Sequence, residues 1–150
     1  MKRPMLVSCL VIVGLCLCLV AAGQALISTR GHTNPPVVSE PNWDSPETRQ
    51  LAKRACFDCH SNETSWPWFT NVPPLSLLVL NDVREGRDRL NFSDWQSTRN
   101  RTRETREISE VVLEGRMPPA LYLLMHPEAR LTQAENAALA QGLAKTFLNP

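Results

Sequence analysis

Apolar positions divide the chain into two stretches of different character. Residues 5–27 hold 19 apolar residues in 23 positions and no charged side chain. A run of that length is long enough to cross a bilayer as a helix. Residues 31–150 hold only 44 apolar residues in 120 positions, although they carry all nine aromatic side chains. We therefore expect an N-terminal transmembrane helix, followed by a fairly polar domain with a thin core.

The second stretch shows helical signals and no alternation typical of strands. Thr132 and Glu135 form a capping box. Behind it, Leu139, Leu143 and Phe147 recur at the spacing of one helix face. The segments expected to be helical are about 45–59, 75–90, a helix starting at Ser93, 103–114 and the last one from 132; residues 61–74 and 115–130 are expected to be irregular. The domain is predicted to be all-α.

A polar, Pro-rich segment separates the apolar run from this domain. Residues 28–43 read STRGHTNPPVVSEPNW and show no periodicity, which is typical of a tether. We therefore expect three parts: a signal anchor at 1–27, a tether at 28–43, and the domain at 44–150.

Basic residues near the N-terminus predict the orientation of the anchor. Lys2 and Arg3 precede the apolar run, which favours a cytoplasmic N-terminus and a domain on the periplasmic or extracytoplasmic side. A cleaved signal peptide is the alternative, because Gly23-Gln24-Ala25 resembles a small-x-small cleavage site. Both interpretations place the domain outside the cytosol.

Charge argues against a nucleic-acid partner. Residues 31–150 carry 13 basic and 15 acidic side chains, a net charge of −2. A nucleic-acid-binding domain is strongly positive instead.

One short motif carries the chemistry. Cys56-Phe57-Asp58-Cys59-His60 is a C-x-x-C-H sequence, the attachment signature of haem c. On a helical turn, positions i, i+3 and i+4 project to one side, so two thiols can bond the haem vinyl groups while the imidazole reaches the iron. A structural zinc site needs four ligands, usually as two pairs, and the domain contains only one such pair. A thioredoxin-like pair needs a βαβ setting, and a disulfide across two helical residues has poor geometry. These comparisons favour one covalent haem c, bound through Cys56 and Cys59 with His60 on the iron, over a zinc site, a redox pair or a disulfide.

The second axial ligand of the iron has more than one candidate. Met117 lies in a loop stiffened by Pro118 and Pro119, and a thioether there gives His/Met ligation with a raised potential. Met125 and His126 are the rivals. We expect Met117 and leave His126 as the alternative.

The motifs together resemble a known family. The residues concerned are Cys56-x-x-Cys59-His60-Ser61, Thr64-x-Trp66-Pro67-Trp68, Glu85-Gly86-Arg87, Leu90-Asn91-Phe92-Ser93-x-Trp95, Met117-Pro118-Pro119, Tyr122, His126-Pro127 and Leu131-Thr132. This order resembles the bacterial membrane-tethered haem-binding domain family over about residues 45–148. The resemblance implies a cytochrome c-like fold around a single haem, with Met117 where many c-type cytochromes place their distal methionine. Gly142 departs from the pattern, since a bulkier packing residue is expected there.

Weaker expectations concern the surroundings of the haem. Trp66, Trp68 and Tyr122 are expected to wall it, with Phe69 as a further candidate. Arg87 and Arg116 are candidates for pairing with propionates. A carbonyl of Pro73 or Pro74 is expected to accept from Nδ1–H of the axial imidazole.

These features favour an electron carrier over an enzyme. No acid–base constellation surrounds the motif, and a tether raises the effective concentration of membrane-bound redox partners. The alternative is a peroxidase-like haem enzyme with an open or displaceable sixth ligand. A haem-based ligand sensor is the third reading.

Overall fold

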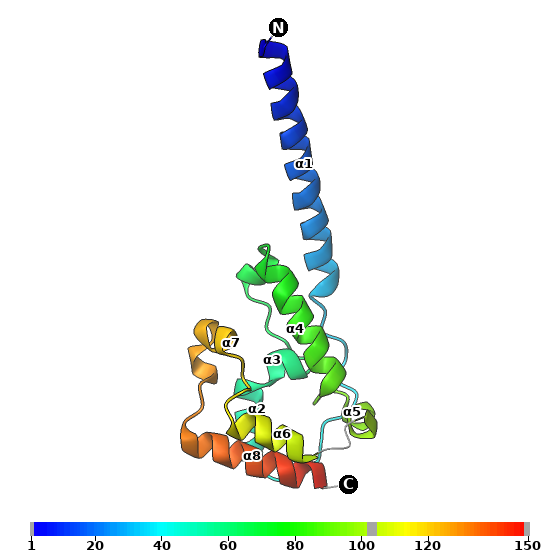
Figure 1. The fold of residues 1–150 in the computed structure, drawn as a ribbon. Helices are drawn as coiled ribbons and strands as arrows, with labels where there is room; N and C mark the ends of the chain where they lie inside the picture. Colours follow the sequence, from blue (N-terminus) through cyan, green and yellow to red (C-terminus); the bar gives the residue numbers. More distant parts are fainter. Residues whose placement is uncertain (1, 102–104, 149–150) are drawn as a thin grey trace. The chain divides into compact units, whose positions relative to one another are not determined.

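The computed structural model describes residues 2–101 and 105–148 (Figure 1). It is 69% helical and has no strand within these residues, so the all-α prediction is confirmed. The one β pairing described is an isolated bridge between Ser39 and Asp94. The helices are α1 (Lys2–Gly31), α2 (Pro46–Ala55), α3 (Phe57–His60), η1 (Trp68–Asn71), α4 (Leu75–Arg89), α5 (Trp95–Arg101), α6 (Thr105–Leu113), α7 (Ala120–Met125), η2 (Pro127–Ala129) and α8 (Gln133–Leu148).

The chain divides into two compact units. The first unit comprises Met1–Thr33 and Trp66–Asn81, and the second comprises Asn34–Ser65 and Asp82–Pro150. Helix α4 therefore begins in the first unit and ends in the second.

The first unit contains the apolar helix. Val7–Leu26 of α1 has a mean hydropathy of 2.5 and is long enough to cross a membrane, although a signal sequence has the same properties. The helix continues to Gly31, beyond the predicted apolar run. At its end, the Leu80 side chain lies where a Cβ of Gly31 would be, and His32 stacks on Trp66 at 4.4 Å.

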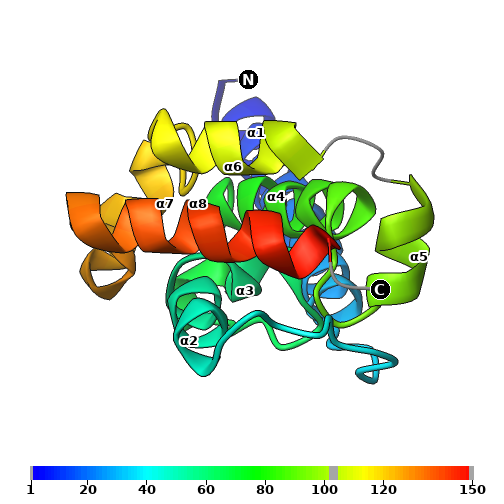
Figure 2. The ribbon, with the colours of Figure 1, turned by 90° about the horizontal axis from the view of Figure 1, so that it is seen from below.

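The second unit is built around the C-terminal helix. Figure 2 shows α6 and α8 side by side and antiparallel, and α2 also packs on α8. The predicted inward face of α8 is confirmed, since Leu139, Leu143 and Phe147 are at most 8% exposed. The capping box is confirmed as well: Thr132 N–H donates to the Glu135 carboxylate, and Glu135 N–H donates to Thr132 Oγ1. The buried core is Leu51, Ala52, Phe57, Leu90, Phe92, Trp95, Val112, Leu139, Ala140, Leu143 and Phe147.

Gly142 corrects the expectation of a bulkier residue. A Cβ at this position would overlap the Thr48 side chain of α2. Glycine is therefore what lets α2 and α8 approach closely, and the expectation was wrong because the space available depends on a helix far away in the sequence.

Three predictions need correction. The predicted helix 45–59 is interrupted at Cys56, whose backbone (φ −127°, ψ −32°) ends α2 and precedes α3. Residues 115–130 are not irregular throughout, because they contain α7 and η2, and residues 61–74 contain the short helix η1. Residues 103 and 104 of the predicted helix 103–114 lie outside the described residues, and the remainder corresponds to α6.

The segment 34–45 lies along the second unit as an ordered strap. Val38 N–H donates to the Ser93 carbonyl at 2.8 Å, and Trp95 N–H donates to the Ser39 carbonyl at 3.0 Å. Asn62 Nδ2 donates to the Pro36 carbonyl at 2.9 Å. These bonds fix the strap beside the loop that follows the C-x-x-C-H motif.

Candidate functional site

The C-x-x-C-H motif forms one tight helical turn in the second unit. Cys56 N–H closes α2 by donating to the Ala52 carbonyl at 2.8 Å. The Cys56 carbonyl accepts from Cys59 N–H at 3.2 Å and from His60 N–H at 2.9 Å. Backbone bonds of this kind bring side chains three and four residues apart to one side, as the attachment of one planar group requires.

The His60 imidazole is held through its Nδ1 atom. This atom lies 3.1 Å from the Gly86 carbonyl and 3.0 Å from the Leu90 carbonyl. Because both partners only accept, Nδ1 carries the proton in the neutral ring and the lone pair is on Nε2. The prediction that Pro73 or Pro74 supplies this carbonyl was wrong, because the end of α4 occupies the place.

Burial keeps both the imidazole and the thiols uncharged. Desolvation lowers the pKa of His60, against the two carbonyl hydrogen bonds that raise it. Burial raises the pKa of Cys56 to about 12, with the nearby Cys59 adding to the effect. Burial also raises the pKa of Cys59 to about 12, and the charges of Asp82 and Asp58 contribute. Both cysteines are free thiols, which are protonated at neutral pH.

Asp58, inside the motif, connects the turn to α7. Its carboxylate accepts from Tyr122 O–H at 2.7 Å and from Ser65 N–H at 2.9 Å. Burial, followed by the bond to Asp58, raises the pKa of Tyr122. The predicted site residue Tyr122 therefore lies beside the motif, joined to it by a hydrogen bond.

Met117 follows a Schellman ending of α6. Gly115 has φ +66°, its N–H donates to the Val112 carbonyl at 3.1 Å, and Arg116 N–H donates to the Val111 carbonyl at 3.0 Å. A left-handed glycine is the usual terminator of this kind. The chain thereby turns away from α6, and Met117 is 37% exposed.

His126, the rival ligand, has its own partners. It stacks on Tyr122 with ring centroids 4.3 Å apart, and its Nδ1 lies 3.1 Å from the Glu128 carboxylate. It is thus part of the same side of the second unit as Tyr122.

Helix α7 is apolar, yet none of its residues is buried. Its Leu121 is 52% exposed and its Leu124 is 68% exposed. Large apolar side chains left exposed together on one short helix are typical of a ligand or interaction site. Together with two thiols and an imidazole with a free lone pair on Nε2, this surface suits the apolar face of a porphyrin.

No bare metal site competes with this interpretation among the residues described. In residues 2–101 and 105–148, no group of three or more His, Cys, Asp or Glu side chains is arranged to hold an ion. A porphyrin supplies the equatorial ligands of its iron, so a single imidazole with one further axial donor is sufficient.

The remaining predicted residues lie elsewhere or have other partners. Trp66 and Trp68 belong to the first unit, and Trp68 is 79% exposed, so their contact with haem stays a prediction. Arg87 donates to the Ser61 carbonyl at 2.8 Å and to Thr64 Oγ1 at 2.9 Å. Arg116 pairs with Glu114 at 2.6 Å. Both arginines thus have protein partners.

Sequence reasoning assigned no role at the site to Gly86 and Asp58. A signal existed for Gly86, since a glycine inside a helix costs about 1 kcal/mol relative to alanine and so indicates a packing requirement. Asp58 gave no such signal, because an acidic residue in a short helix is most simply explained by solvation.

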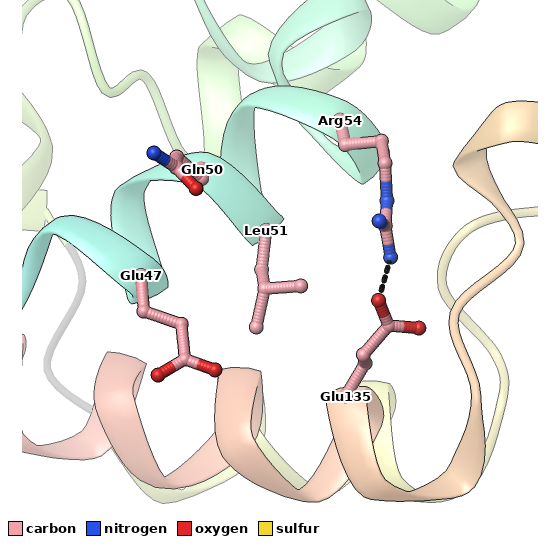
Figure 3. A pocket seen from close by; sticks show the side chains of 5 residues that line it. All are labelled: Glu47, Gln50, Leu51, Arg54 and Glu135. Atoms are coloured by element: carbon pink, nitrogen blue, oxygen red, sulfur yellow. Dashed lines mark hydrogen bonds and ion pairs between the residues drawn. The ribbon is translucent and has the colours of Figure 1, made fainter.

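A pocket of about 340 Å³ lies between α2 and α8 (Figure 3). Its lining is polar apart from Leu51, and Arg54 bridges to Glu135 across one side. Because a porphyrin needs apolar walls, this pocket is not the candidate haem site.

The helical second unit, with its thiols, fixed imidazole and uncovered apolar helix, has the features of a haem-binding protein. The model of the haem-binding domain family matches residues 19–145, and the chain belongs to this family. No curated protein and no solved structure matches the chain.

Proposed function

We propose that the chain carries one haem c and transfers single electrons at the outer face of a membrane. The observation that supports this most directly is the His60 imidazole, fixed through Nδ1 and with its lone pair on Nε2, on the same turn as two free thiols. Cys56, Cys59 and His60 would hold the haem, which would supply one-electron chemistry between its ferric and ferrous states.

Cys56 and Cys59 attach the group as thioethers. Each thiol adds across one vinyl group: its sulfur bonds one vinyl carbon and its hydrogen goes to the other. No external oxidant or reductant is consumed. Because covalent attachment keeps the group in place, a domain with a thin core can use it as an additional apolar surface.

In this proposal Met117 would supply the second protein ligand of the iron. Met117 follows the end of α6, is partly exposed, and lies shortly before the apolar helix α7. Its thioether sulfur is therefore accessible for bonding to a haem iron. A neutral, soft sulfur donor favours ferrous iron and raises the potential. Six-coordinate iron has no open position, which suits a carrier.

The apolar helix α1 holds the carrier at the membrane. Lys2 and Arg3 precede the candidate span, which favours a domain on the extracytoplasmic side. Protease added to spheroplasts should then digest the domain and leave a short N-terminal membrane fragment. A mature N-terminus near residue 24 or 26 would instead identify a cleaved signal peptide.

The attachment is tested by haem staining on denaturing gels, after expression with a haem c maturation system. The parent protein should retain the stain, and Cys56→Ala with Cys59→Ala should abolish it. Cys16→Ala with Cys18→Ala, which removes two thiols of α1, is the matched control and should keep it. Loss of all haem from the parent on denaturation would overturn the covalent assignment.

The second ligand is tested by spectroscopy. The ferric protein should show the weak red charge-transfer band of methionine–iron bonding. Met117→Ala should remove this band, lower the reduction potential and let the ferrous iron bind carbon monoxide. Met125→Ala and His126→Ala are the controls and should keep the band. If His126→Ala alone changes the spectrum, the Met117 ligation is wrong and the carrier proposal loses support to a haem enzyme.

A further inference from the structure

We propose that Gly86 is a positioning residue for the axial imidazole. Its missing side chain lets the end of α4 lie against the C-x-x-C-H turn, so that the carbonyls of Gly86 and of Leu90, the residue just after the helix, hold His60 Nδ1–H and lower the haem potential. This inference rests on the proposed function, because it takes His60 as the iron ligand.

The close approach of α4 depends on glycine. An added Cβ at Gly86 would overlap the Cys59 carbonyl oxygen and would lie 2.9 Å from its carbonyl carbon and 3.1 Å from its Cβ. The obstacle is mainly backbone, which cannot rotate away as a flexible side chain does. Val83 of α4 and Leu90, just after the helix, are also buried, so alanine at position 86 would have to push the end of α4 away from the motif.

The two carbonyls that α4 brings to His60 differ in their prior bonding. The Gly86 carbonyl already accepts from Leu90 N–H at 2.9 Å, so His60 is its second donor. The Leu90 carbonyl lies one residue beyond the end of the helix, where carbonyls have no partner within the helix. The imidazole satisfies it.

The end of a helix also carries partial negative charge. Placed at Nδ1–H, this charge and the two acceptors make the imidazole a stronger electron donor through Nε2. A stronger donor stabilises ferric over ferrous iron. The α4 contact therefore opposes the rise in potential that a methionine on the other side produces.

Arg87 fixes this arrangement from the neighbouring position. Its guanidinium donates to the Ser61 carbonyl, directly after His60, and to Thr64 Oγ1. It also donates to Asn34 Oδ1 of the strap at 3.0 Å. These bonds hold the register of α4 against the motif next to Gly86, so a Cβ at Gly86 would change the position of the carbonyls at His60 Nδ1.

The test compares Gly86→Ala with Gly142→Ala in the haem-loaded full chain. Both glycines are helical, and a Cβ at either position would overlap a neighbour, but Gly142 faces Thr48 instead of the motif. Gly86→Ala should keep the covalent haem and favour the ferrous state about tenfold, a positive shift of 59 mV for a one-electron couple. Gly142→Ala should leave the potential unchanged. An unmoved potential in Gly86→Ala, or an equal shift in both variants, overturns the inference.

A second measurement needs no variant. In the ferrous, diamagnetic parent, the Nδ1–H proton of His60 should exchange with solvent at least tenfold more slowly than in a free imidazole–haem complex, because two carbonyls hold it. Exchange at the rate of the free complex overturns the inference, even if Gly86→Ala fails to fold.

Failure of the proposed function gives a different result. It would appear as haem lost on denaturation, or as a spectrum that His60→Ala leaves unchanged. Failure of the Gly86 inference alone would leave haem attachment and His60 ligation intact while the potential and the proton exchange show no effect.

Discussion

Two parts of the second unit differ in how completely the protein itself packs them. One is the C-x-x-C-H motif with the residues around it (the motif side), and the other is helix α7 (the α7 side). On the motif side, His60 has two carbonyl acceptors, and Phe57 and Phe92 are buried and stacked at 5.6 Å. On the α7 side, an apolar helix has no buried residue, and one side-chain hydrogen bond, from Tyr122 to Asp58, joins it to the motif. The protein thus forms the motif side by its own packing and leaves α7 an apolar surface still to be covered.

This difference suits the covalent haem proposed above. Thioether formation would need both sulfurs near one planar group, and the ordered turn keeps the two thiols close together. A wall that closes over the haem gains its burial from the haem itself. Rigidity on one side and an uncovered apolar helix on the other are therefore compatible with a single haem site.

The largest expected effect is on the motif side. Phe92 is fully buried and stacks on Phe57 and Trp95, and its N–H donates to the His60 carbonyl at 2.8 Å. Phe92→Ala should lower the free energy of unfolding by about 3–5 kcal/mol, measured by denaturant titration of the haem-loaded chain in detergent. Leu148→Ala, at a 75% exposed position, should change it by less than about 0.5 kcal/mol. Equal costs would contradict a packed motif side.

How much of this was predictable depended on the distance in sequence over which each feature is determined. The capping box at Thr132 and the C-x-x-C-H turn involve residues within four positions, and both followed from spacing. The partners of His60 come from 26 and 30 residues away, and the requirement for glycine at position 142 comes from Thr48 of another helix. Such features depend on how helices pack, which local pattern does not specify.

The sequence analysis missed helix α7 for a different reason, the prolines around it. Pro118, Pro119 and Pro127 flank it closely, and prolines at that spacing are typical of a loop. The six residues of α7 begin just after Pro119, which serves as the N-cap. Proline is tolerated at a helix start because its missing N–H is not needed there.

The second prediction concerns α7 with and without haem. Because the helix has no buried residue, its amides should open easily until a haem covers it. Hydrogen exchange in α7 should be about a hundredfold faster in the Cys56→Ala, Cys59→Ala variant than in the parent. Amides of α8 provide the internal control and should keep their protection. If α8 loses protection equally, the haem supports the whole unit and the contrast between its two sides is wrong.

The third prediction concerns the hydrogen bond that joins the two sides. Tyr122→Phe removes the donor to Asp58 and should cost about 1–2 kcal/mol of unfolding free energy. It should also speed exchange in α7 without changing exchange in α8. Arg116→Gln, which breaks an exposed pair with Glu114, should cost less than about 1 kcal/mol. If the two substitutions cost the same, the Tyr122 bond does not hold α7 to the motif.

The smallest expected effect is a pH dependence from the strap. Two hydrogen bonds from Arg49, at 2.7 and 2.8 Å, are the largest cause that lowers the pKa of Glu40, and Trp43 donates to the same carboxylate. Because the folded pKa lies below the unfolded value of about 4.5, the pair stabilises the fold above that pH. The contribution is lost as the pH falls through the folded pKa.

Denaturant titrations between pH 6 and about pH 3 should show a shallower loss of stability in Glu40→Gln than in the parent. Arg49→Gln should flatten the profile in the same way, since both changes remove one pair. An unchanged acid slope in both variants would mean that this pair does not fasten the strap to α2.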